Sequence, residues 1–291
     1  MIAVDWGTSS FRAFRLARDG AIVARVEAPD GILAVTNGAF AAVLRAHVGA
    51  WLADGETRIL LSGMVGSRQG WVEAPYLPCP AGAADIAAAL VAIPFDGATL
   101  RLVPGLTDTD EGGTPEVMRG EETQIVGVLE HLPQGIACLP GSHSKWARIE
   151  ARRITGYRTY LSGEAFAALR GGTILGRMMT DGPTDEAAFD RGLARAGEPG
   201  HLLHHLFGVR SLGLFGRLAE SASASYLSGL LIGHEVNAAQ PAGLRVHLIG
   251  AAPLCALYAR AISLAGGTAI LEDTDAAARG LAIIGKLAAW T

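Results

Sequence analysis

Apolar and polar positions interleave in short runs near the start of the chain. Residues 2–4 are apolar, residues 11–16 mix apolar side chains with arginine, and an Asp19-Gly20 pair separates them from residues 21–26, which are apolar except for Arg25. Short runs of this kind around an Asp-Gly turn are typical of antiparallel strands. The pattern predicts a three-stranded antiparallel meander.

The same arrangement returns in the middle of the chain. An apolar run over 136–139 leads into a glycine-hydroxyl turn, and strand patterns follow over 145–150 and 154–161. At an offset of 134 positions (136 minus 2), Ile2, Ala3, Gly7, Ser10 and Ala13 match Ile136, Ala137, Gly141, Ser144 and Ala147. Internal similarity at a fixed offset indicates duplication, so we expect two related halves.

Helical spacing alternates with strand patterns over the rest of the chain. We expect strands at 59–61, 100–103 and 245–249, and helices at 36–52, 83–92, 121–132, 225–239, 253–264 and 275–287. Acidic side chains suit the first turn of the helix over 121–132, which ends before Pro133. Alternating strands and helices predict an α/β fold.

Composition narrows the class of function. The 291 residues are 50% hydrophobic, and their formal net charge of −4 comes without the basic stripe of a nucleic-acid binder. Polar residues interrupt every apolar run well short of the roughly 18 residues of a membrane span, and no signal peptide is visible. Cys79, Cys138 and Cys255 are widely spaced and odd in number, which fits reduced, buried thiols. We expect a cytoplasmic protein with a small-molecule substrate and neither a nucleic-acid nor a membrane partner.

The first strand leads into a candidate anion-binding turn, Asp5-Trp6-Gly7-Thr8-Ser9. A carboxylate at a strand end suits a metal ion, and glycine followed by hydroxyls lets amides and side chains approach an anion closely. Taken alone, such a turn is more often only a turn. We expect Gly7, Thr8 and Ser9 to contact a polyphosphate that Asp5 helps to hold through a metal.

Two later segments have similar properties. Gly141-Ser142-His143-Ser144-Lys145 repeats the turn without the acid and adds two possible cationic donors. Gly250 and Ala251 join a strand to a helix whose N-terminus suits a nucleotide, although an ordinary loop has the same composition. Two facing turns of the first kind would hold one phosphate chain from both sides.

Together these elements resemble the phosphate-1, phosphate-2 and adenosine elements of the actin, hexokinase and Hsp70 superfamily. The resemblance implies an α/β, two-lobed actin-like ATPase fold of the ribonuclease H-like kind, with duplicated lobes and a cleft between them. The first lobe would comprise residues 1–117 plus 275–291, and the second residues 118–274. The sequence departs from the pattern at Leu139, where many relatives carry aspartate, so the second turn must act through residues 142–145.

Seven segments resemble the 2-keto-3-deoxygalactonokinases more narrowly. They are VDWGTSSFRAFRL (4–16), SGMVGSRQGW (62–71), PYLPCPAG (75–82), PGLTDTD (104–110), MRGEETQIVG (118–127), LPGSHSKWA (139–147) and LSGLLIGHE (227–235). The resemblance implies transfer of the γ-phosphoryl group of ATP, with Mg²⁺, to the 6-hydroxyl of 2-dehydro-3-deoxy-D-galactonate in galactonate breakdown.

Phosphoryl transfer requires charge neutralisation, positioning and a group that takes the hydroxyl proton. Asp5 is the candidate for organising Mg²⁺. Glu121, Glu122, Asp108 and Asp110 are all candidates for the base. We favour Glu121, because its surroundings weakly resemble the Gly-x-Glu-Glu helix start of exopolyphosphatases; the alternative is an acid that only stabilises a helix.

The carboxylate of a keto acid requires a cation or backbone amides. The glycine-rich loop that contains Ser62, Gly63, Met64 and Arg68 offers both. Arg119 is the second choice for the cation, and an ordinary surface arginine is the alternative interpretation of either residue.

Other functions stay open at this point. A kinase for another sugar acid, a polyphosphate phosphohydrolase or a non-kinase ATPase would use the same turns, and a homodimer is one alternative for the oligomeric state. His201, His204 and His205 have metal-like spacing, but the leucines among them favour a packed helix. Ser142-x-x-Lys145 matches a serine-hydrolase motif that requires a helix where we predict a strand.

Overall fold

The computed structural model describes residues 1–290. Contacts between Cα atoms divide the chain into two compact units. The first unit consists of Met1–Gly135, Ala147–Arg158 and the segment from Asp273 onward. The second consists of Ile136–Trp146 and Thr159–Glu272.

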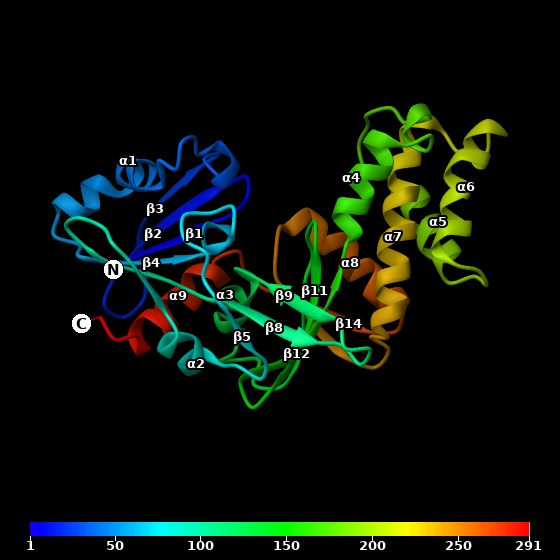
Figure 1. Cartoon of the computed structure of the whole chain (residues 1–291). Coiled ribbons are helices and arrows are strands. Elements are labelled where there is room, and N and C mark those ends of the chain that lie inside the picture. Colours follow the sequence, from blue (N-terminus) through cyan, green and yellow to red (C-terminus); the bar gives the residue numbers. More distant parts are fainter. Residues whose placement is uncertain (291) are drawn as a thin grey trace. The chain divides into compact units, whose positions relative to one another are not determined.

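A six-stranded sheet forms the centre of the first unit (Figure 1). Its strand order is β3-β2-β1-β4-β7-β6. The bounds are Ile2–Trp6 for β1, Phe11–Leu16 for β2, Ile22–Ala28 for β3, Arg58–Ser62 for β4, Val91–Ile93 for β6 and Thr99–Leu102 for β7. β2 pairs antiparallel with β1 and with β3, and β1 pairs parallel with β4. The predicted N-terminal meander is therefore confirmed.

Burial explains why the strands of this sheet have different patterns. Every residue of β1 is buried, as expected for a central strand that is covered on both faces. The edge strand β3 alternates half-buried and exposed positions. Trp6 and Phe11 anchor the core, and their rings meet edge to face with centroids 5.0 Å apart. This packing fixes the end of β1, where Asp5 lies.

Four helices and a small sheet complete the first unit. The helices are α1 (Phe40–Ala53), α2 (Ala83–Ala88), α3 (Glu121–Val126) and α9 (Ala276–Leu287), and the sheet has the order β5-β8-β9, with β5 at Tyr76–Pro78, β8 at Gly105–Thr109 and β9 at Pro115–Met118. A Cβ atom on Gly280 of α9 would lie 1.8 Å from the carbonyl oxygen of Thr123 in α3. This close packing places residues 118–135 in the first unit, whereas the sequence-based boundary assigned them to the second lobe.

The second sheet repeats the topology of the first. Its order is β12-β11-β10-β13-β14, with β10 at Gly135–Leu139, β11 at Ser144–Glu150, β12 at Arg153–Tyr160, β13 at Arg245–Leu248 and β14 at Thr268–Leu271. β10 pairs parallel with β13, and β13 pairs parallel with β14. This order matches β3-β2-β1-β4-β7 strand for strand, which confirms the predicted duplication.

Five helices belong to the second unit: α4 (Ser162–Gly172), α5 (Glu186–Ala196), α6 (Leu202–Leu214), α7 (Ser223–Ala239) and α8 (Ala252–Leu264). The long helix α7 lies among the others and contacts α4, α5, α6 and α8 (Figure 1). Its central position explains why most of its residues are buried.

Two expected helices end early. The helix expected over 121–132 stops at Val126, where Gly127 is the C-cap, and the helix expected over 83–92 stops at Ala88. The apolar residues 91–93 instead pair with β7 as an edge strand. Within residues 1–290, no helix is both long and apolar enough to cross a membrane.

Candidate active site

Asp5 lies near the end of β1, between two strands that carry polar partners. In the sheet register it faces Arg12 on β2 and Ser62 on β4. The residue is 8% exposed, and its Oδ2 accepts a hydrogen bond from Arg12 Nη2. Sequence analysis did not select Arg12, although its place in a hairpin opposite Asp5 was a usable signal.

The turn after β1 presents hydroxyl groups to solvent. Gly7 N donates to the Ser10 carbonyl at 2.9 Å, which closes the turn. The carbonyl oxygens of Gly7 and Thr8 accept from Ile32 N at 3.0 Å and Leu33 N at 3.2 Å. Thr8 and Ser9 are exposed. The turn is thus held by its carbonyl oxygens, while the hydroxyl groups that suit a phosphate are accessible.

Gly63 brings the end of β4 against the end of β1. Its φ of 97° lies in a region that favours glycine, and a Cβ atom there would lie 2.7 Å from the Trp6 carbonyl oxygen and 3.2 Å from Asp5 Oδ1. A Cβ atom on Gly120, just before α3, would lie 3.1 Å from Gly63 Cα. The structure therefore brings Asp5, Gly63 and the start of α3 together.

The two glutamates at the start of α3 have different surroundings. Glu121 is half-buried, and its Oε2 accepts from Arg119 N at 2.9 Å. Glu122 is fully buried; its Oε2 accepts from Gly120 N at 2.7 Å and its Oε1 from the Thr123 hydroxyl at 2.9 Å. Burial, and then the neighbouring charge of Glu121, raise the pKa of Glu122 to about 8. Glu122 is therefore a buried acid with structural partners on both oxygens.

The two candidate arginines differ in access. Arg119 is 8% exposed, its Nη2 donates to the Ala74 carbonyl at 2.7 Å, and its guanidinium lies 4.4 Å from the centroid of the Tyr76 ring. Its Nε and Nη1 have no hydrogen-bond partner among residues 1–290. The Arg68 side chain is 87% exposed and lies 3.4 Å from Glu73. Met64 follows Gly63 in a short 3-10 helix, Met64–Gly66.

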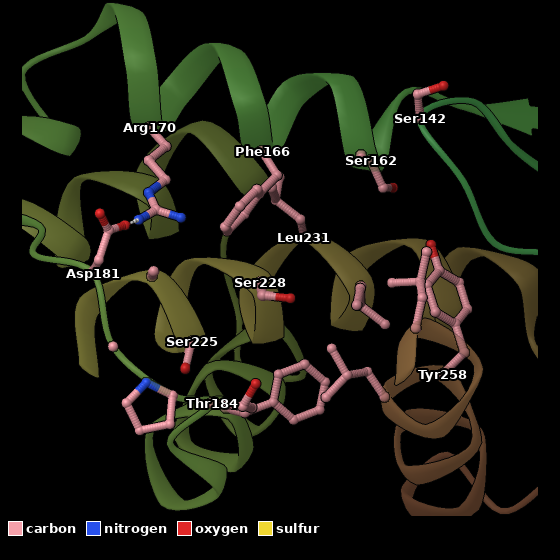
Figure 2. A pocket seen from close by; sticks show the side chains of 18 of the residues that line it. Ser142, Ser162, Phe166, Arg170, Asp181, Thr184, Ser225, Ser228, Leu231 and Tyr258 are labelled. Atoms are coloured by element: carbon pink, nitrogen blue, oxygen red, sulfur yellow. Dashed lines mark hydrogen bonds and ion pairs between the residues drawn. The ribbon is translucent and has the colours of Figure 1, made fainter. Parts of the chain in front are cut away.

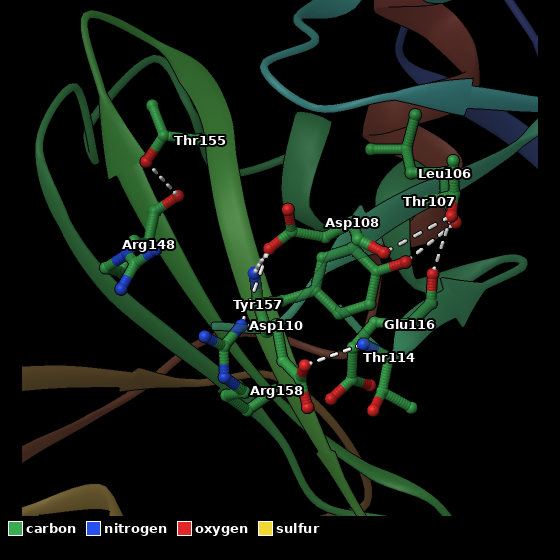
Figure 3. Close-up of polar contacts among 10 residues, drawn as sticks. All are labelled: Leu106, Thr107, Asp108, Asp110, Thr114, Glu116, Arg148, Thr155, Tyr157 and Arg158. Carbon is green, nitrogen blue, oxygen red and sulfur yellow. Dashed lines mark hydrogen bonds and ion pairs between the residues drawn. The ribbon is translucent and has the colours of Figure 1, made fainter. Parts of the chain in front are cut away.

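Asp108 and Asp110 belong to the hairpin formed by β8 and β9 (Figure 3). Asp108 Oδ2 accepts from Tyr157 N at 3.0 Å and lies 3.6 Å from Arg158 Nη1. Asp110 Oδ1 accepts from Thr114 N at 2.8 Å, which stabilises the hairpin turn. Both carboxylates are therefore held by hydrogen bonds to backbone amides of the first unit.

The turn between β10 and β11 packs on the first turn of α4. Glu164 N donates to the Ser142 carbonyl at 3.0 Å, and His143 Nε2 contacts Glu164 Oε2. A Cβ atom on Gly163 would lie 2.4 Å from the Gly141 carbonyl oxygen. Ser142 and His143 are exposed.

Lys145 occupies a different environment. The residue is 4% exposed, and its Nζ donates to the Thr159 hydroxyl of β12 at 2.9 Å. Ser144 is also buried and begins β11. The Ser-x-x-Lys segment therefore leads into a strand, as predicted.

A pocket of about 550 Å³ opens beside the β10–β11 turn. Figure 2 shows that Ser142 and Ser162 lie at one side of it, with Phe166, Leu231 and Tyr258 among its walls. Most of these lining residues come from α4, α7 and α8, of which only the start of α8 was connected with the site from the sequence. The hydroxyl side chains on these helices were the available signal.

Gly250 and Ala251 lie where β13 leads into α8. Gly250 has a φ of 157°, and a Cβ atom on it would lie 3.5 Å from the Pro140 carbonyl oxygen. Ala251 is the N-cap of α8 and is exposed. The start of α8 is thus next to the β10–β11 turn, as the sequence-based interpretation requires.

The histidines with metal-like spacing have a packing role. His205 is fully buried, and its Nδ1 lies 3.0 Å from His234 Nε2 on α7. His204 Nε2 lies 3.2 Å from Arg195 Nη2. These contacts join α6 to α7 and α5, and residues 202–214 form the helix that sequence analysis favoured.

Comparison with known proteins identifies the family. A family model described as 2-keto-3-deoxy-galactonokinase matches residues 5–284. A relative from Rhizobium meliloti (strain 1021), named "Probable 2-dehydro-3-deoxygalactonokinase", is 37% identical over 95% of this chain and 93% of its own length. The 2-dehydro-3-deoxygalactonokinase of Escherichia coli (strain K12) is 32% identical over 94% of this chain and 93% of its own length.

A solved structure agrees with this result. The crystal structure of a candidate 2-dehydro-3-deoxygalactonokinase from Sinorhizobium meliloti has a TM-score of 0.89 and 35% identity, and the match covers 98% of this chain and 95% of that one. The duplicated sheets and their strand order are those of the actin-like ATPase fold. The chain therefore belongs to the 2-keto-3-deoxy-galactonokinase family.

Proposed function

We propose that the chain transfers the γ-phosphoryl group of ATP to the terminal 6-hydroxyl of 2-dehydro-3-deoxy-D-galactonate, in the cytoplasm where ATP is supplied. The observation that carries the proposal is the convergence of Asp5, Gly63 and the acidic start of α3. Two carboxylates and a close-approach glycine in one small region suit metal-assisted transfer to a hydroxyl group. Family membership supplies the identity of the acceptor.

The pocket in the second unit suits the nucleoside part of ATP. A volume of about 550 Å³ is in the range of small-molecule sites. Phe166, Leu231 and Tyr258 offer apolar surface for a flat base, and Ser162 offers a hydroxyl. The exposed turn beside the pocket, with Gly141 and Ser142, would contact phosphate oxygens, and the N-terminus of α8 at Gly250 and Ala251 favours negative charge.

The surroundings of Asp5 fit Mg²⁺. This ion keeps several waters and takes few protein carboxylates when substrate phosphates are present. Arg12 engages Asp5 Oδ2, while Oδ1 faces Gly63, which has no side chain to cover it. When bound, Mg²⁺ would neutralise charge on the phosphates. The nearby Gly7, Thr8 and Ser9 would contact the same phosphates through amides and hydroxyl groups.

Glu121 is the proposed base. Glu122 is fully buried and its pKa is raised by that burial, and Asp108 is held by Tyr157 and Arg158. Glu121 is half-buried in the first helical turn, next to the Gly63–Gly120 contact. A carboxylate there would accept the proton of the attacking hydroxyl late in the transfer.

Arg68 is the proposed partner of the sugar-acid carboxylate. Its side chain is exposed on the loop that starts at Ser62 and Gly63. The Arg119 guanidinium is instead enclosed: a Cβ atom on Gly66 would lie 3.1 Å from its Nη1. Arg119 therefore supports the loop from within, whereas Arg68 is accessible to an anion.

Three variants test these roles by steady-state kinetics. Asp5→Asn and Glu121→Gln should each lower kcat by about 100-fold or more, the usual effect of losing charge stabilisation or a general base. Arg68→Ala should raise KM for the sugar acid about tenfold and leave KM for ATP unchanged. A Glu121→Gln variant with near wild-type kcat would contradict the assignment of the base.

A further inference from the structure

Glu235 is a buried carboxylate on α7 whose donors come from three other elements. The residue is 3% exposed. Trp146 Nε1 of β11 donates to Oε1 at 2.8 Å, and the Tyr258 hydroxyl of α8 donates to Oε2 at 2.8 Å. The Ser162 hydroxyl, in the first turn of α4, also donates to Oε2. One carboxylate therefore joins β11, α4, α7 and α8.

Two of these donors line the nucleotide pocket, while Glu235 itself does not. Ser162 and Tyr258 both face the pocket (Figure 2). Ser162 also begins the helical turn that packs on the β10–β11 turn through Glu164 N and the Ser142 carbonyl. The position of the pocket wall and the position of the phosphate-side turn therefore depend on the same carboxylate.

The chemistry of the three partners matches an ionised glutamate. An ionised carboxylate only accepts hydrogen bonds, and all three partners donate. Charge-assisted hydrogen bonds in a buried place are short and directional, so they fix the orientation of their donors. Burying a charge is costly, and an apolar side chain would fill the same space without that cost. The carboxylate therefore does more than fill space on α7.

We propose that Glu235 is a positioning residue for nucleotide binding. It fixes the Ser162 hydroxyl and the Tyr258 ring in the pocket wall and sets their position relative to the β10–β11 turn. The inference rests on the proposed use of this pocket for ATP. It deepens that proposal, because it names a residue outside the pocket on which nucleotide affinity depends.

The test compares ADP binding, measured by isothermal titration calorimetry, in wild type and in Glu235→Gln and Ser162→Ala. Glutamine keeps the volume and one acceptor for Trp146, but its amide group forces both hydroxyls to act as acceptors. Asn237→Ala is the matched control. It lies on the same helix, and its amide donates to the Ala196 carbonyl at 3.2 Å, with neither residue lining the pocket.

Glu235→Gln and Ser162→Ala should each bind ADP about tenfold more weakly, which is the effect of losing one hydrogen bond to a charged group. KM for ATP should rise by a similar factor, with kcat changed less than about threefold. Asn237→Ala should keep wild-type ADP affinity. If Glu235→Gln does not fold, Tyr258→Phe removes one of the three donors, keeps the ring and should weaken ADP binding in the same direction.

Wild-type turnover of the sugar acid is measured first, because its absence contradicts the proposed function independently of the ADP titrations. Suppose that the wild type is active and that the variants at Glu235, Ser162 and Tyr258 all bind ADP within about twofold of wild type but unfold at lower temperatures. The network would then be purely structural. That result would overturn the inference and leave the proposed function intact.

Discussion

The hydroxyl groups of Ser62 and Thr123 lie 2.7 Å apart, which joins the end of β4 to the first turn of α3. Thr123 donates in turn to Glu122. This hydrogen-bonded chain holds the start of α3 beside Gly63 and Asp5. The geometry of the candidate site in the first unit therefore depends on residues that do not themselves contact a substrate.

Gly63→Ala should abolish activity and destabilise the fold. The methyl group would lie 2.7 Å from the Trp6 carbonyl oxygen, and the backbone conformation adds a cost of about 1–3 kcal/mol. Gly55→Ala is the matched control, because Gly55 also has a positive φ of 94° but nothing lies within 4 Å of its Cβ position. Thermal unfolding and kcat should separate the two variants; equal effects would show that the close approach at Gly63 has no role.

Glu122→Gln should flatten the dependence of stability on pH. The Glu122 carboxyl has a pKa of about 8 in the folded chain, against 4.5 ordinarily. The stability that it contributes is therefore complete below pH 4.5 and is lost as pH rises through 8, with a slope of up to about 1.4 kcal/mol per pH unit. A glutamine at position 122 stays neutral at every pH. Its amide group can donate to the Thr123 hydroxyl, which then donates to Ser62, so the hydrogen-bonded chain is kept.

Urea unfolding at several pH values between about 5 and 8.5 measures this effect. The free energy of unfolding of wild type should fall with rising pH, whereas that of Glu122→Gln should fall less. Parallel curves for the two proteins would contradict a raised pKa of Glu122 in the folded state.

Asp108→Asn should reduce stability more than catalysis. Asn can still accept from Tyr157 N, but the ion pair with Arg158 is lost, so we expect a loss of about 1 kcal/mol. kcat should stay within about threefold of wild type. A loss of kcat of about 100-fold with unchanged stability would instead assign the base to Asp108.

Lowering the pH should destabilise α6 and α7 before the rest of the chain. Burial, and then the charges of His205 and His201, lower the pKa of His234. Its contribution to stability is present above the ordinary histidine pKa of about 6.5 and is lost as pH falls below it. Protection factors of the α6 and α7 amides, which are corrected for the pH dependence of intrinsic exchange, should fall between about pH 7 and 5.5 in wild type and fall less in His234→Gln. Equal decreases in protection would exclude His234 as the cause.

The parts of the fold that could be predicted are those whose sequence patterns involve residues close together in the chain. The two meanders were readable because alternating runs and turns are local patterns, and five matches at one offset, Gly7 with Gly141 among them, indicated duplication. The small sheet of β5, β8 and β9 was not predicted: the β8–β9 hairpin is local but was not recognised, and the pairing of β5 with β8 joins segments about 29 residues apart. Asp185, which caps α5 by accepting from Ala188 N at 2.9 Å, was a readable start signal that was not used.

The site was predictable in part for a similar reason. Asp5, Gly63 and Glu121 lie in conspicuous motifs, and the structure brings them together. Lys145 was selected as a phosphate donor from its motif, and in the structure its Nζ donates to the Thr159 hydroxyl, which the motif did not indicate. Glu235 was passed over because its partners lie far away in the sequence: Ser162 is 73 residues away and Trp146 is 89 residues away. A carboxylate in the apolar helix pattern over 225–239 was the only hint of its role.

The proposed kinase activity is tested by measuring ADP release from Mg-ATP by the wild-type protein with 2-dehydro-3-deoxy-D-galactonate, with its gluconate epimer, and without a sugar acid. We expect ADP release that depends on the galactonate-derived acid and yields one phosphorylated product, with phosphate on the 6-hydroxyl. ADP release that is equally fast without a sugar acid would contradict the kinase and indicate an ATPase or phosphohydrolase of the same fold.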